Sequence, residues 1–214
     1  MTVEPGPQTS AAIDTMSTEY AERLVRLQTA WWKRVLPVQA PYRYNLRRLE
    51  PGFTLDVSCG IGRNLSHLDG KGVGIDHNPQ SVAVARARGF SAYTPEEFAA
   101  SEHTQSGAFD SLLCSHVAEH MDGESFVALL SDYLPFVRSG GKLIVITPQE
   151  VGFRSDASHI EFVDFDAIDA AAASVGAELT RAYSFPFPRP VGRLFIYNEF
   201  VWVGRVRGIA VEAR

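Results

Sequence analysis

The chain has 214 residues, of which 45% are hydrophobic and 21% are charged, and its formal net charge is −5. This length and composition predict one compact globular domain, and the negative charge excludes a general attraction to nucleic acid or to anionic membranes. No apolar run is long enough for a transmembrane helix, and residues 1–7 lack the basic and apolar regions of a signal peptide. We therefore expect a cytoplasmic protein without nucleic-acid or membrane partners. Cys59 and Cys114 predict no disulfide framework.

The first fifty residues predict a tail and a helical cap. Residues 1–16 are rich in Pro, Ser and Thr, which predicts a disordered tail, and residues 17–214 are expected to form the single domain. The cap covers about residues 17–50, with one helix from 18 to 36 and a second short helix from 42 to 49. Trp31 and Trp32 are candidates for closing over a ligand, for the core or for a homodimer contact.

Strands and helices alternate after the cap. Strands are predicted at 53–58, 72–76, 90–93, 110–115 and 142–147, and helices near 62–68, 79–88, 95–100, 123–137 and 165–175. This alternation predicts an α/β fold in which helices cover both faces of a parallel sheet and ligands bind at the carboxyl ends of the strands. Two final strands, 178–185 and 195–204, have no helix between them and predict a hairpin.

A nucleotide-cofactor site is predicted where the first strand ends. Gly60 and Gly62 follow a short apolar run, and glycine lets the backbone turn tightly and approach a ligand. Asp76 ends the second strand twenty residues after Asp56, a position at which an acid can accept both hydroxyls of a ribose. The alternative is an ordinary strand-to-helix turn without a ligand.

The same turn argues against a dinucleotide. A pyrophosphate needs a third glycine and an unobstructed helix N-terminus, whereas Arg63 and Asn64 follow here. Asp56 would repel phosphate, but it suits a cationic ligand that carries an amino group and a sulfonium.

The segment Leu-Asp-Val-Ser-Cys-Gly-Ile-Gly-Arg at 55–63 resembles the first motif of class I S-adenosylmethionine-dependent methyltransferases. The resemblance continues through Gly-Ile-Asp at 74–76, Phe-Asp at 109–110 and Ser-Gly-Gly at 139–141, and covers about residues 40 to 205. It implies a Rossmann-like fold with a seven-stranded, mostly parallel sheet whose last strand is antiparallel. Ser58 departs from the glycine that is usual in this family, so we expect a local adjustment of the turn.

The resemblance also implies which residues bind S-adenosylmethionine. Asp76 is expected on the ribose hydroxyls, and Thr94 or Glu96 near the adenine, although the acids here also suit the first turn of a helix. Arg43 and Asn45 are candidates for the methionine carboxylate or for a solvent-facing stripe. The remaining expected contacts are Asp56, Ser58, Gly60, Gly62, His77, Asn78, Ser115 and His116.

A second group of functional residues is predicted after the fourth strand. His116, Glu119 and His120 would share one face of a helical turn, and the pattern is similar to a Glu-x-x-Glu-His turn that holds a divalent metal in some O-methyltransferases of this class. By that resemblance, His159 would complete a site for Mg²⁺ or Mn²⁺. The alternative is a catalytic centre of His120, Glu119 and His159 in which His120 is a metal-free base.

Histidine or metal chemistry beside a methyl donor points to an oxygen acceptor, because a weakly nucleophilic alcohol must lose its proton during attack. We therefore expect an O-methyltransferase acting on a sugar, an oligosaccharide or a related small molecule. The alternatives are a phenol or quinone O-methyltransferase and a catalytically silent cofactor-binding protein. Candidate acceptor contacts are residues 149–150, 153–154, His159 and 189–198.

Overall fold

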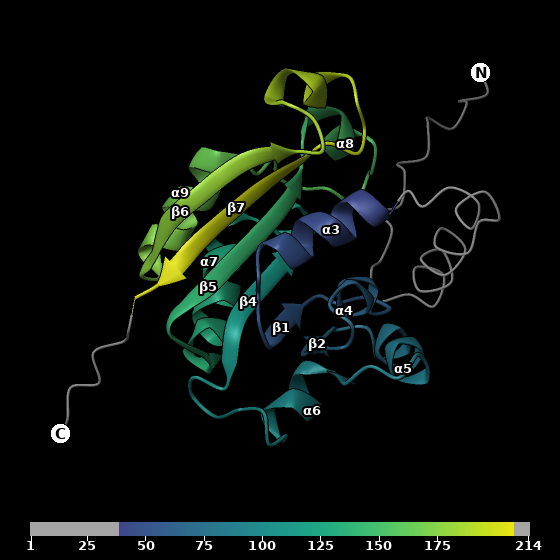
Figure 1. Ribbon diagram of the computed structural model, residues 1–214, viewed down its shortest axis with the longest axis vertical. Helices are drawn as coiled ribbons and strands as arrows, with labels where there is room; N and C mark the ends of the chain where they lie inside the picture. The colour runs from purple at the N-terminus through teal and green to yellow at the C-terminus, as the bar shows by residue number, and fades with distance from the viewer. Residues whose placement is uncertain (1–38, 208–214) are drawn as a thin grey trace, which may run out of the picture.

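The computed structural model describes residues 39–207 (Figure 1). The expected tail at 1–16 and the first cap helix, with Trp31 and Trp32, lie outside the described residues. The helices are α3 (Ala40–Arg48), α4 (Arg63–His67), α5 (Pro79–Ala87), α6 (Pro95–Ala99), α7 (Gly123–Tyr133), α8 (Glu150–Arg154) and α9 (Phe165–Ser174). The strands are β1 (Thr54–Val57), β2 (Gly72–Ile75), β3 (Ala92–Tyr93), β4 (Phe109–Ser115), β5 (Val137–Pro148), β6 (Ala177–Phe185) and β7 (Glu199–Val206).

These strands form one seven-stranded sheet in the order β3-β2-β1-β4-β5-β7-β6. The pairs from β3 to β5 are parallel, whereas β7 is antiparallel to both of its neighbours. The strand order reverses between β1 and β4, so the segments that follow these two strands diverge and leave room for a ligand. The predicted α/β fold and its antiparallel last strand are confirmed.

Alternating side chains of the central strands pack against helices on opposite faces of the sheet. On one face, Leu112 and Leu143 join a core with α6, α7 and α9. On the other, Leu113 and Ile144 join a core with Leu46 of α3. Figure 1 shows α3 crossing one side of the sheet and α9 lying on the other. Because both faces are covered, only the strand ends remain open for binding.

The structure departs from the predicted elements at several places, including the start of β5 at Val137 and the unpredicted helix α8. The helix predicted at 123–137 ends at Tyr133, and a short 3-10 turn (Leu134–Phe136) follows, because Pro135 cannot continue an α-helix. The connection between β6 and β7 was expected to be a plain loop, but it contains the 3-10 helix η3 (Arg189–Arg193). Among residues 39–207, no helix is long and apolar enough to cross a membrane.

The packing around β2 gives a stability prediction. A Cβ at Gly74 would lie 2.5 Å from Cys59 Sγ and 2.9 Å from Cys59 Cβ. Gly74→Ala should therefore lower the free energy of unfolding by about 1–3 kcal/mol, the usual cost of overpacking a close-packed interior. Urea denaturation measures this change. Gly123→Ala is the control, because the nearest atom to its Cβ lies 3.9 Å away; equal unfolding midpoints for both variants would contradict the prediction.

Candidate active site

The turn after β1 is held in a left-handed backbone conformation. Ser58, Gly60 and Gly62 have φ angles of 57°, 54° and 81°. This region is open to glycine and costs other residues about 1 kcal/mol, which explains why glycine is the usual residue at position 58 in the family that this segment resembles. A Cβ at Gly62 would lie 2.6 Å from the ring of Phe90, so the turn also requires glycine for close packing.

Asp76 connects this turn to the end of β2. Its Oδ2 accepts a hydrogen bond from the backbone N–H of Gly60 at 2.8 Å, and its Oδ1 accepts one from that of Asn78 at 2.9 Å. Asn78 in turn caps α5 through hydrogen bonds from Gln80 and Ser81. The Asp76 carboxylate lines a cavity, where its remaining lone pairs can accept hydroxyl protons.

We call this space the donor cavity. Its other walls are largely apolar, including Ile75, Val117 and Leu129, with Tyr133 beside them. One carboxylate at the end of β2 and apolar walls beyond it fit the ribose and adenine of S-adenosylmethionine. The expected cofactor residues that line it are Ser58, Gly60, Asp76, His77 and His116.

Other expected cofactor residues lie elsewhere. The Thr94 hydroxyl accepts a hydrogen bond from the backbone N–H of Glu97 in a capping box at the start of α6. Glu96 is exposed. Pro95, which lies between Thr94 and Glu96, lines the donor cavity. Asp56 lines neither this cavity nor the acceptor cavity described below.

Asp56 is fully buried beneath the turn. Its Oδ1 accepts from Asn64 at 3.3 Å, and its Oδ2 has no hydrogen-bond partner among the described residues. Burial raises the pKa of Asp56 to about 7, with Asn64 and the nearby Arg63 opposing the shift. A cationic group bound above the turn would favour the ionised carboxylate, as expected for a sulfonium donor that carries an amino group.

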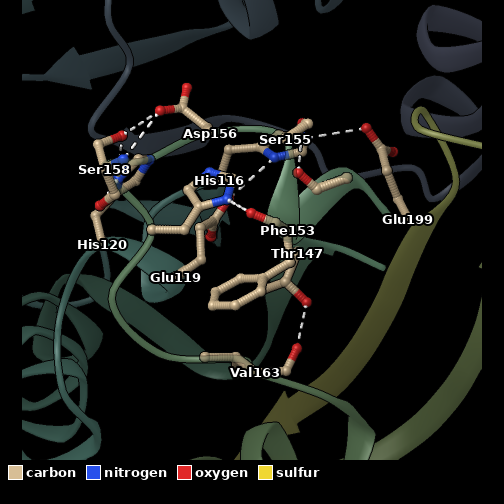
Figure 2. Close-up of polar contacts among 12 residues, drawn as sticks. His116, Glu119, His120, Thr147, Phe153, Ser155, Asp156, Ser158, Val163 and Glu199 are labelled. Carbon is tan, nitrogen blue, oxygen red and sulfur yellow. Dashed lines mark hydrogen bonds and ion pairs between the residues drawn. The ribbon is translucent and has the colours of Figure 1, made fainter. Parts of the chain in front are cut away.

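His116 is held between two carboxylates. Its Nδ1 lies 3.1 Å from Glu119 Oε1 and its Nε2 lies 3.0 Å from Glu199 Oε1 (Figure 2). Burial lowers the pKa of His116, but the two carboxylates outweigh it and raise the pKa to about 9, so the imidazole is a cation that donates through both nitrogens. Both ring nitrogens already contact carboxylates, so the expected role of His116 as a metal ligand, which stays a prediction, would require one of these contacts to break. We call Glu119, His116 and Glu199 the histidine clamp.

Glu119, His120 and His159 form a second cluster, which shares Glu119 with the histidine clamp. One potential ligand atom from each lies within 4.8 Å of the others. Glu119 is fully buried, and its Oε2 has no hydrogen-bond partner among the described residues. The structure thus brings together the three residues that the sequence placed at the catalytic centre.

The two imidazoles of this cluster are oriented by backbone carbonyls. His120 Nδ1 lies 3.2 Å from Ser158 O, and His159 Nδ1 lies 2.7 Å from Phe153 O. A carbonyl oxygen only accepts, so both contacts use a proton on Nδ1, and the Nε2 atoms face away from these carbonyls; the Ser158 hydroxyl also lies 3.4 Å from His120 Nδ1. His159 also stacks on the ring of Phe153. Both Nε2 atoms are therefore available to a metal ion or to a proton of the acceptor.

A second cavity opens beside His116, and we call it the acceptor cavity. Its lining includes Ser115, Asp156 and Glu199, which are polar, and Tyr42 and Tyr197. The Tyr42 hydroxyl donates a hydrogen bond to the Tyr197 carbonyl oxygen at 2.8 Å. Burial raises the pKa of Tyr42, and the negative charge of Glu199 raises it further. His116 lines both cavities, so they meet at the histidine clamp.

Several expected acceptor or carboxylate contacts are already engaged within the protein. Arg189 forms a two-pronged ion pair with Glu150 at 2.8 and 2.5 Å, and Asn45 accepts from Tyr183 at 2.6 Å. Arg63, which also lines the acceptor cavity, has no such partner among residues 39–207. Sequence analysis did not single out Glu199, because no local pattern marks a carboxylate that meets a histidine 83 positions away.

The histidine clamp predicts a pH dependence of stability. A histidine whose pKa is raised stabilises the folded protein below its unfolded-state pKa near 6.5, and this contribution disappears as the pH rises through about 9. We expect a loss of about 1–3 kcal/mol of unfolding free energy over this window. Glu199→Gln should move the loss to lower pH.

Urea unfolding between pH 6 and 10 measures this effect, and the NMR titration of the His116 ring reports its pKa directly. His116→Gln identifies the signal. An His116 pKa near 6.5 in the native protein would contradict the clamp.

Comparison with known proteins identifies the fold and its domain. Residues 55–145 match the family described as a methyltransferase domain. A methyltransferase from Archaeoglobus fulgidus superimposes with a TM-score of 0.62 at 18% identity, over 77% of this chain and 92% of that one. Magnesium protoporphyrin IX methyltransferase from Synechocystis superimposes with a TM-score of 0.63 at 15% identity, over 90% of this chain and 97% of that one. A methyltransferase from Corynebacterium glutamicum superimposes with a TM-score of 0.61 at 15% identity, over 90% of this chain and 100% of that one.

No curated protein sequence matches the chain significantly. The solved structures share its fold at low identity, and the matched segment contains the glycine turn, Asp76 and the start of the catalytic cluster. Together, these findings show a methyltransferase domain at residues 55–145 within a chain that has the fold of S-adenosylmethionine-dependent methyltransferases.

Proposed function

We propose that this methyltransferase transfers the methyl group to a hydroxyl oxygen of a small-molecule or glycan acceptor, with a sugar as the preferred class. The observation that carries the proposal is the cluster of Glu119, His120 and His159, in which two imidazoles held through Nδ1 lie beside a buried carboxylate. Methyl transfer to oxygen needs a group that removes the hydroxyl proton during attack.

His120 is the best-placed base. It lines the donor cavity, and its ring orientation is fixed by the Ser158 carbonyl, so Nε2 can receive a proton without a change of tautomer at Nδ1. Glu119 lies next in the chain and contributes negative charge that stabilises the imidazolium formed on His120. The histidine clamp holds the other oxygen of Glu119, which fixes the direction of its unpaired Oε2.

The sharper version of the proposal adds a divalent metal on Glu119, His120 and His159. The donor set fits such an ion, because both Nδ1 atoms are bound by outer groups and a buried carboxylate oxygen lacks a partner. A bound metal would raise the acidity of an acceptor hydroxyl. Two nitrogen ligands suit Mn²⁺ or another transition metal better than Mg²⁺, which prefers oxygen.

The acceptor cavity supports a hydroxyl-rich acceptor. Its lining offers the side chains of Ser155 and Asp156 as hydrogen-bonding groups and Tyr42 and Tyr197 as aromatic ones. Sugars combine hydroxyls with apolar faces, and this combination of side chains recognises both.

The donor side is tested by Asp76→Asn. The variant keeps the shape of the side chain but removes the charge that accepts the ribose hydroxyls, so S-adenosylhomocysteine should bind about 10- to 100-fold more weakly. Titration calorimetry measures the affinity, and circular dichroism checks that the variant is folded. Glu102→Gln, which removes an exposed charge, is the control. Unchanged affinity in Asp76→Asn would place the ribose elsewhere.

The acceptor side is tested by His120→Ala and His159→Ala. Both variants should retain S-adenosylhomocysteine affinity but lose at least about 100-fold of the turnover seen with a panel of sugar, catechol and quinol acceptors. His103→Ala is the control, because His103 contacts the rings of Tyr93 and Phe109 and lines neither cavity. Full turnover in both cluster variants would place the chemistry on other residues.

The metal has its own readout. Electron paramagnetic resonance of the full chain titrated with Mn²⁺ should show one bound ion, which is lost in Glu119→Gln and His159→Ala. Chelation should then abolish turnover. Mn²⁺ binding that is equal in all variants would reject the metal, and chelator-resistant turnover that still needs His120 would assign a metal-free base.

A further inference from the structure

A pocket rich in basic side chains adjoins the acceptor cavity, and we call it the basic pocket. It is lined by residues of α3, of α4 and of the segment at the end of α5, and by Gln39, which precedes α3. The polar side chains from these elements are those of Arg43, Arg63, Ser66, His67 and Arg88. Gln39, Arg63 and His67 line the acceptor cavity as well, so a ligand in one space can extend into the other.

Among residues 39–207, no acid forms an ion pair with Arg43 or Arg63 of this pocket. No Asp or Glu of residues 39–207 lines it. Other arginines have carboxylate partners, as in Arg86–Glu97 at 2.6 Å and Arg138–Asp110 at 2.7 Å. Within the same part of the chain, Arg43 and Arg63 form no ion pair. Because the whole chain carries a net charge of −5, this local excess of positive charge runs against the general balance.

His67 supports the same picture. Burial lowers its pKa to about 4, and Arg63 and Arg43 contribute further, so its imidazole is neutral at physiological pH. Arg63, Ser66 and His67 occupy positions i, i+3 and i+4 of α4 and therefore share one face of that helix. Two guanidinium groups, a hydroxyl and a neutral imidazole together offer donors suited to a multivalent oxyanion.

We propose that the basic pocket binds an anionic group of the acceptor, a phosphate or a carboxylate, through Arg43 and Arg63. The planar forks of arginine match these oxyanions with two parallel hydrogen bonds. The other source of such a group is the methionine carboxylate of the donor. The acceptor is favoured because the basic pocket shares three lining residues with the acceptor cavity and none with the donor cavity.

This inference rests on the proposed function, since it names the chemical class of the acceptor. Its first test is titration of the full chain with inorganic phosphate at constant ionic strength. Arg43→Gln/Arg63→Gln should bind phosphate at least about tenfold more weakly than the native protein, the scale expected for lost charge-assisted hydrogen bonds. Arg48→Gln/Arg205→Gln removes the same charge from exposed positions outside the pocket and should leave phosphate affinity unchanged.

The second arm identifies the source of the anionic group. The affinity of Arg43→Gln/Arg63→Gln for S-adenosylhomocysteine should stay within about twofold of the native value. If these arginines bound the donor, the loss of a charged hydrogen bond would lower this affinity by more than about twofold. A parallel loss of S-adenosylhomocysteine affinity, with competition by phosphate, would assign the pocket to the donor and overturn the proposal. Equal phosphate affinity in both double variants would overturn it too. Failure of the native protein to bind S-adenosylhomocysteine contradicts the proposed function instead, while the phosphate comparison still decides the basic pocket.

Discussion

The carboxylate of Asp76 is the contact on which the donor site depends. It accepts one backbone N–H from the turn after β1 and another from the turn after β2, so a single side chain fixes both loops that must meet the donor. The left-handed turn would otherwise be free to relax, since Ser58 is strained there. Asp76 thus has a structural role in the protein, and the recognition role that we propose for it would use other lone pairs of the same oxygens.

The histidine clamp plays the corresponding part on the acceptor side. It joins the end of β4 to the start of β7 through one half-buried imidazole between two carboxylates. Burying the Glu119 carboxylate without a cationic partner would be costly, because an isolated charge in a protein interior loses its hydration. His116 offsets that cost at Oε1, while Oε2 has no hydrogen-bond partner among residues 39–207. The left-handed backbone at His116, with φ of 59°, allows this placement.

Local pattern made most of the fold and the donor site predictable. The periodicity of apolar residues predicted most of the strands and helices, although it missed the end of α7 before Pro135. The glycine turn and Asp76 predicted where the donor cavity lies. Thr94 and Glu97 match the sequence signature of a capping box, which is how the structure uses them. Glu199 and the engagement of Arg189 by Glu150 were not predictable, because they depend on which distant segments meet at one end of the sheet. The position of His116 between two carboxylates was not predictable for the same reason.

The anchors of the catalytic cluster are main-chain oxygens, and this determines how the site can evolve. His120 and His159 are oriented by the carbonyls of Ser158 and Phe153, and Thr147 ties the same loop to β5 through the carbonyl of Val163 at 2.8 Å. A carbonyl is present whatever side chain the residue carries, so the identity of the anchoring residues is free to drift. An insertion or deletion between residues 153 and 163 would instead displace every anchor at once. Divergence among relatives should therefore conserve the length of this loop more strictly than its composition.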